Sequence, residues 1–120
     1  MKKVGLIGLG AMGLGMAGSL RKAGFDLAVF DIRPEVAEQF AKDGGTACKS
    51  LADLATRSDI VVSVVVNAAQ TEEILFGTST SSGITDTLKL GSVFVMCSTV
   101  DPNISIEFEK RLAEKNILYV

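Results

Sequence analysis

Six residues near the start of the chain have types and a spacing that suggest a binding role. They follow the pattern G-x-G-x-x-G and are Gly8, Leu9, Gly10, Ala11, Met12 and Gly13. Residues 3–8 have the apolar character of a strand and residues 11–24 have helical spacing, which is the context that a dinucleotide-binding turn requires. Gly8 permits the tight turn, Gly10 lets a pyrophosphate approach the backbone, and Gly13 lets the helix pack on the strand. The N–H groups of Gly10, Ala11 and Met12 are then expected to point at the phosphates, aided by the helix dipole. A glycine-rich turn without a ligand is the alternative.

Asp31, the second candidate, ends the predicted strand 26–31 and comes eighteen residues after Gly13. A carboxylate in this place accepts hydrogen bonds from the hydroxyls of an adenosine ribose. Arg33 follows it, and this side chain can stack on adenine or hold a 2′-phosphate, which the charge of Asp31 would repel. The sequence therefore favours NAD as the cofactor and leaves NADP open. The alternative for Asp31 is a helix N-cap or a solvated strand end.

Four more candidates lie at the ends of two further apolar runs. Val65 and Val66 end one run, and Ser98 and Thr99 follow the other. Since ligands of parallel sheets bind outside the carboxyl ends of the strands, we expect both places to line the same crevice. Ordinary strand core is the alternative for the two valines, and hydroxyl groups that bond to a turn are the alternative for Ser98 and Thr99.

The composition excludes several other kinds of chemistry. The 120 residues include no histidine, so histidine catalysis and histidine metal sites are excluded within the chain, and no metal site is predicted. The net charge of −2 gives no electrostatic reason to expect a nucleic acid or an anionic membrane as a partner. The apolar run 60–66 is too short to span a bilayer. Because Cys48 and Cys97 suit a reducing compartment, we expect a soluble, cytoplasmic protein.

The elements that must position these residues alternate along the whole chain. The predicted strands occupy residues 3–8, 26–31, 46–48, 59–66, 92–97 and 117–120. Helix start signals stand between them: Pro34, the N-caps Ser50 and Asn67, and Asp101-Pro102. Short connections and buried strands predict an α/β fold, a Rossmann-like doubly wound parallel sheet of order 3-2-1-4-5-6 that is truncated at the sixth strand.

This sheet order makes a prediction about the two cysteines. Cys48 and Cys97 would lie four strand spacings apart, about 19 Å. A disulfide needs Cα atoms about 5.5 Å apart. We therefore expect two free, buried thiols.

Two motifs resemble those of a known family, the β-hydroxyacid dehydrogenases. Residues 8–17 (GLGAMGLGMA) resemble its G-L-G-x-M-G-x-x-M-[SA] signature, and residues 98–102 (STVDP) are similar to its S-T-[VI]-x-P motif. The family includes 3-hydroxyisobutyrate dehydrogenase and tartronate semialdehyde reductase and, more distantly, 6-phosphogluconate dehydrogenase. The resemblance covers essentially the whole chain, and residues 66–77 look most like the L-threonate dehydrogenase branch.

The resemblance implies roles for individual residues. It assigns the dinucleotide turn to residues 8–13 and the ribose-binding acid to Asp31, and places nicotinamide-side contacts at Val65, Val66, Gln70 and Thr99, with Ser98 on the substrate side. Ser19 departs from the asparagine that many members have. The chain stops at Val120, just before the place of the family's substrate-binding D-x-x-[VS]-S-G-G motif, and the family's catalytic lysine comes later still. No catalytic residue is therefore assigned in this chain.

The resemblance also implies a function for the complete protein. Residues 1–120 would be the cofactor-binding half of an oxidoreductase that moves hydride between NAD(P) and a small β-hydroxyacid of the 3-hydroxyisobutyrate, threonate or tartronate-semialdehyde type. A helical domain outside this chain would bind substrate and form a homo-oligomer, and the chain alone would be inactive. The alternatives are a non-catalytic, nucleotide-sensing Rossmann domain and a methyltransferase-type fold, which also has an acid after its second strand.

Overall fold

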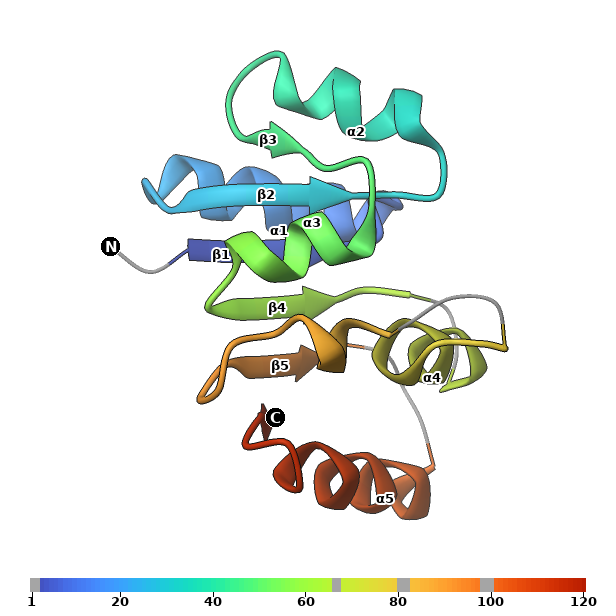
Figure 1. Cartoon of the computed structure of the whole chain (residues 1–120). Helices are drawn as coiled ribbons and strands as arrows, with labels where there is room; N and C mark the ends of the chain where they lie inside the picture. The colour runs from blue at the N-terminus through green and yellow to red at the C-terminus, as the bar shows by residue number, and fades with distance from the viewer. Residues whose placement is uncertain (1–2, 66–67, 80–82, 98–100) are drawn as a thin grey trace.

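The computed structural model describes residues 3–65, 68–79, 83–97 and 101–120, which form a parallel sheet with helices on both faces (Figure 1). The strands are β1 Lys3–Ile7, β2 Asp26–Phe30, β3 Thr46–Ala47, β4 Ile60–Ser63, β5 Val93–Met96 and β6 Leu118–Tyr119. The helices are α1 Ala11–Lys22, α2 Pro34–Ala41, α3 Leu51–Arg57, α4 Ala68–Phe76 and α5 Pro102–Ala113, with the 3₁₀ helix η1 Ile84–Asp86. The strands run β3-β2-β1-β4-β5-β6, so the predicted Rossmann-like order is confirmed.

The helices begin where the sequence signals them. The Ser50 side chain accepts a hydrogen bond from the Asp53 N–H at 3.0 Å, and Asp101 accepts one from the Asn103 N–H at 2.8 Å. Asn67, the predicted cap of α4, lies outside the described residues. In the described part of the chain, no helix has both the length and the apolar character needed to cross a membrane.

Two hydrophobic cores, one on each face of the sheet, hold the helices in place. The core under α1 and α2 includes Ala17, Phe40, Leu6, Leu27 and Val29. The core under α3, α4 and α5 includes Leu54, Leu75, Phe108, Leu112, Val61 and Phe94. Successive residues of the central strands alternate between the two cores, which is the pattern of strands buried on both faces.

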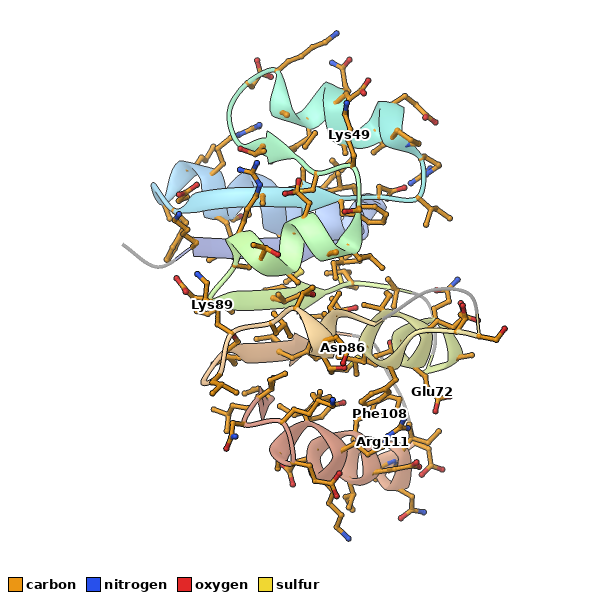
Figure 2. All side chains as sticks on the ribbon, viewed as in Figure 1. Lys49, Glu72, Asp86, Lys89, Phe108 and Arg111 are labelled. Atoms are coloured by element: carbon orange, nitrogen blue, oxygen red, sulfur yellow. The ribbon has the colours of Figure 1, made fainter. Side chains whose placement is uncertain are left out.

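Arg111 on α5 contacts two side chains of α4. The Arg111 guanidinium lies 3.6 Å from the centre of the Phe76 ring and bonds to the Glu72 carboxylate at 3.1 Å. The Phe76 ring in turn packs against Phe108 of α5, with ring centres 5.9 Å apart (Figure 2). The two helices that follow β4 and β5 therefore act as one packed pair.

All six strands are shorter than the sequence predicts, although the pairing of β3, β4 and β5 continues past their assigned ends. β4 ends at Ser63 rather than at residue 66, yet the Val64 N–H donates to the Ile7 carbonyl oxygen at 2.8 Å. The N–H groups of Cys48 and Cys97, just after β3 and β5, likewise bond to neighbouring strands, at 2.8 and 3.0 Å. The predicted ends are therefore wrong by one to three residues, although these three strands each make a further hydrogen bond past their assigned ends.

The two cysteines are free, as predicted, but only Cys48 is buried. Burial raises the pKa of the Cys48 thiol to about 11, so it is an inert core residue. The prediction that Cys97 is buried is wrong, because its side chain is only half covered. Cys97 lies on the face of the sheet that α1 and α2 cover, at the end of β5, where that cover is incomplete.

The incomplete cover extends over the β4–β5–β6 half of this face. In Figure 1, α1 lies behind β1 and β2, while α3 lies in front of the sheet. On the α1 side, Val64 and Val95 are half-buried, and Leu118 and Val120 are 62% and 64% exposed. One half of one sheet face therefore presents apolar side chains to solvent in the described structure.

Candidate functional site

The turn between β1 and α1 lies at the carboxyl end of the sheet, between the ends of β2 and β4. The Gly8 N–H donates to the Phe30 carbonyl oxygen of β2 at 2.9 Å, and a Cβ on Gly8 would overlap the Val64 carbonyl oxygen beside β4. Gly8 has a φ of +97°, in the left-handed region that glycine adopts without strain. A glycine thus reverses the chain at the switch point of the strand order, where doubly wound sheets bind their ligands.

Gly10 and Gly13 have opposite surroundings. A Cβ on Gly10 would find no heavy atom within 4 Å, so the backbone there is open to a ligand. A Cβ on Gly13 would overlap the Gly8 carbonyl oxygen, and Gly13 is buried. Helix α1 therefore packs directly on the turn at Gly13, while the turn stays open at Gly10.

The first N–H groups of α1 form a row of donors without acceptors. Within the described residues, no protein hydrogen bond is made by the N–H groups of Gly10, Ala11, Met12 and Gly13. The first helical bond runs from the Leu14 N–H to the Gly10 carbonyl oxygen at 2.8 Å, and the first turn holds no acidic side chain. These donors, together with the positive end of the helix dipole, can bind an anion such as a phosphate group.

Asp31 connects this turn to the loop after β2. Its Oδ2 accepts a hydrogen bond from the Leu9 N–H at 2.8 Å. Its Oδ1 accepts from the Arg33 N–H at 2.9 Å and from the Arg33 Nε at 3.0 Å. Asp31 is buried and Arg33 is the N-cap residue of α2, so both alternatives for Asp31, a solvated strand end and a helix N-cap, are wrong.

Opposing effects act on the ionisation of Asp31. Burial raises the pKa of its carboxyl, whereas the hydrogen bonds from the Arg33 side chain, the Arg33 N–H and the Leu9 N–H lower it, as does the Arg33 charge. The hydrogen bonds and the charge prevail, and the pKa lies below its ordinary value. Asp31 is therefore a carboxylate at neutral pH.

A depression of about 430 Å³ opens beside Asp31, between the end of β2, helix α2 and the end of β3. Its lining is mostly apolar, with three charged residues: Phe30, Asp31, Ile32, Pro34, Ala37, Glu38, Ala47, Cys48 and Lys49. Lys49 is exposed two residues after β3 (Figure 2). The Arg33 side chain, which pairs with Asp31, is 55% exposed.

On the β4 side, the structure places Val65 and Gln70. Val65 is half-buried, and its side chain is 3.5 Å from where a Cβ on Gly8 would lie. Gln70 is exposed in the first turn of α4. Val66, Ser98 and Thr99 lie outside the described residues. The described site therefore brings together residues 8–13, Asp31, Arg33 and Val65 around one turn.

The sequence reasoning missed two features of this site. The helical spacing of Met12 and Met16 predicts that both pack on the core, but Met12 is 63% exposed at the start of α1, whereas Met16 packs against the core. The bond between Asp31 and the Leu9 N–H was also not foreseen. The predicted strand order contained a signal for this hydrogen bond. Strands 1 and 2 are neighbours in that order, so the residues that follow their carboxyl ends must lie close together.

Comparison with known proteins gives a consistent picture. The family model that matches residues 3–120 describes the NAD binding domain of 6-phosphogluconate dehydrogenase. L-Threonate dehydrogenase of Cupriavidus necator is 44% identical over 98% of this chain, and mitochondrial 3-hydroxyisobutyrate dehydrogenase of Rattus norvegicus is 32% identical over 98% of it. The matched segments make up 38% and 34% of these two proteins, so the chain spans little more than a third of their length.

A solved structure agrees with the sequence comparison. The crystal structure of 3-hydroxyisobutyrate dehydrogenase from Salmonella typhimurium has a TM-score of 0.91 and 31% identity. The match covers 99% of this chain and 40% of that one. The backbone arrangement of the sheet, turn and helices is therefore shared with this protein.

Proposed function

Because the chain belongs to the family of the NAD binding domain of 6-phosphogluconate dehydrogenase, we propose that its glycine turn holds the pyrophosphate of NAD. The observation that supports this most is the row of N–H donors at Gly10, Ala11, Met12 and Gly13 next to the open backbone of Gly10. Phosphate oxygens would accept from these donors, and the absence of a side chain at Gly10 leaves room for them.

The adenosine half of the cofactor would lie toward β2. Asp31 accepts from the ribose hydroxyls there, and Arg33 lies against the adenine. Because Asp31 is an ionised carboxylate, it disfavours the 2′-phosphate of NADP, and the protein prefers NAD. Val65, Val66, Gln70 and Thr99 would face the nicotinamide half, with Ser98 on the substrate side.

The complete protein, in this proposal, is a dehydrogenase of a small hydroxyacid. The 44% identity to an L-threonate dehydrogenase favours a threonate-like substrate. Bound NAD supplies the hydride acceptor, and the residues of this chain bind and orient it. Residues 3–120 form the dinucleotide-binding domain, and a further domain brings the substrate and the group that takes its proton. The chain alone therefore binds the cofactor without turnover.

The compartment, the partners and the oligomeric state of the protein are also part of the proposal. Two free cysteines favour the reducing cytoplasm. The net charge of −2 disfavours nucleic acid and anionic membranes as partners. The complete enzyme would assemble into a homo-oligomer through its further domain.

The test is a calorimetric titration of NAD and NADP into the chain and two glycine variants. Gly10 and Gly15 are matched, because a Cβ on either would meet no atom within 4 Å, yet only Gly10 belongs to the turn. The unaltered chain should bind NAD more tightly than NADP. G10V should lower the affinity for NAD by at least about tenfold, or about 1.4 kcal/mol, while G15A should leave it unchanged.

Urea denaturation of both variants checks that they remain folded. A folded G10V variant that binds NAD as tightly as the unaltered chain would contradict the proposed site. A severalfold preference of the unaltered chain for NADP would contradict the role given to Asp31.

A further inference from the structure

We propose that Asp31 is also a positioning residue: its carboxylate fixes the glycine turn through the Leu9 N–H and so aims the N–H groups that follow. This inference rests on the proposed function, because it concerns the same dinucleotide site. It differs from the ribose role, since it requires no contact between Asp31 and the ligand. Asp31 then affects phosphate binding as well as ribose binding.

The two oxygens of the carboxylate have different main partners, although the Arg33 Nη2 also makes a long hydrogen bond of 3.5 Å to Oδ2. Oδ2 faces the turn and accepts from the Leu9 N–H at 2.8 Å. Oδ1 faces the loop after β2 and accepts from the Arg33 N–H and Nε at 2.9 and 3.0 Å. The side chain of Asp31 is only 6% exposed, so water does not readily replace these bonds. One carboxylate therefore bridges two loops that are far apart in sequence.

Two consecutive N–H groups of the turn are anchored to the end of β2 in this way. The Gly8 N–H bonds to the Phe30 carbonyl oxygen at 2.9 Å, and the Leu9 N–H bonds to Asp31. The Leu9 side chain is 1% exposed and adds a hydrophobic anchor. The donors without acceptors begin at the next residue, Gly10. The direction in which Gly10, Ala11 and Met12 present their N–H groups therefore depends on the peptide that Asp31 holds.

Removing the carboxylate would leave the buried Leu9 N–H without a partner. A buried donor in this state tends to turn toward another acceptor or toward water, because the unpaired group is costly. Either movement rotates the peptide just before the phosphate-binding groups. A ligand that carries phosphates but no ribose hydroxyls should then also bind less well.

Two ligands separate the two tasks of Asp31. ADP has the ribose hydroxyls, and 2′,3′-dideoxy-ADP lacks both of them while keeping the phosphates. Calorimetric titrations of both ligands are compared for the unaltered chain, D31A, D31L and D53A. D53A is the matched control, because Asp53 pairs with the Arg57 Nε at 3.0 Å, as Asp31 pairs with the Arg33 Nε, but belongs to α3 and not to the proposed site. D31L keeps the approximate shape of the side chain without an acceptor should D31A fail to fold.

We expect the Asp31 variants to lose at least about fivefold in affinity for dideoxy-ADP, whereas D53A loses less than about twofold. An Asp31 variant that binds ADP less well but dideoxy-ADP as tightly as the unaltered chain would overturn the inference.

Amide hydrogen exchange of Leu9, followed by NMR, tests the bond between Asp31 and the Leu9 N–H without a ligand. Exchange at Leu9 should be at least about tenfold faster in D31A than in the unaltered chain, while Gly8, bonded to the backbone of β2, keeps its rate. Unchanged exchange at Leu9 would overturn the inference even if the unaltered chain bound neither nucleotide. Failure of the unaltered chain to bind ADP or NAD would instead overturn the proposed function.

Discussion

Asp31 links the ionisation of one side chain to the stability of the site. Its pKa is lower in the folded chain than in the unfolded chain, so its ionised form favours folding. This contribution is fully present above the unfolded pKa, about 3.9, and is lost as the pH falls through the lower folded pKa. Acid should therefore weaken the site before it unfolds the core.

The corresponding prediction compares the unaltered chain with D31N in urea denaturation at a series of pH values. At neutral pH the variant should have a free energy of unfolding lower by about 1–3 kcal/mol, because a buried donor loses its charged acceptor. The difference should shrink as the pH falls below about 4, because the unfolded chain takes up the proton first and the native carboxyl is protonated only at lower pH. A difference that stays constant down to about pH 2 would contradict this role for the ionised carboxylate.

Helix α1 and strand β1 meet at Gly13, and their contact makes a prediction about the helix. In G13A, the new Cβ would overlap the Gly8 carbonyl oxygen, so the helix must shift away from the turn. We expect the free energy of unfolding to fall by about 1–3 kcal/mol and NAD affinity to fall with it. G15A, on the open side of the same helix, should gain about 0.5–1 kcal/mol. Equal unfolding free energies in the two variants would show that the close contact at Gly13 does not limit the packing of α1.

The elements themselves could be predicted from the sequence because each carries a local signal. The glycine at residue 24 adopts a φ of +88° after α1, and Ser50 and Asp101 cap their helices. The strand ends were less predictable, since residues 64–66 are as apolar as the strand before them. Whether such residues remain in the sheet depends on the neighbouring strands, which local sequence does not describe.

The site was predictable in its parts but not in its connections. The spacing of the glycines and the acid after the second strand located the turn and Asp31. The bond between Asp31 and Leu9 joins residues 22 apart in sequence and depends on how two loops meet. The exposure of Met12 and the half-exposure of Cys97 likewise depend on where helices end and which part of a sheet they cover.

At the scale of the whole molecule, the described residues leave one half of one sheet face incompletely covered. Leu118 and Val120 of this face are exposed, beside half-buried Val95 and Val64. The relatives are nearly three times as long as the segment matched here, and we propose that a further domain covers this face in the complete protein. An uncovered apolar face beside a two-residue edge strand favours self-association.

Sedimentation of the 120-residue chain tests this account of the face. The chain should self-associate, and L118K should weaken the association by at least about tenfold, because a charge on the face opposes its burial. I106K is the matched control, since Ile106 is also an exposed apolar residue, 49% accessible, but lies on α5, which packs on the other face. Equal weakening by the two variants would show that association does not use the uncovered face.

The most direct measurement is an NMR titration of NAD into the isotope-labelled chain, followed through every backbone amide. Binding at the glycine turn should saturate and move the amide signals of residues 8–13 and 31–33 most, because these groups would contact the phosphates and the ribose. Signals at the opposite, amino-terminal end of the sheet, such as those of Lys89 and Gly91, should stay in place. Saturable shifts centred on that opposite end, or no saturable shifts with a folded chain, would contradict the assignment of this turn as the NAD site.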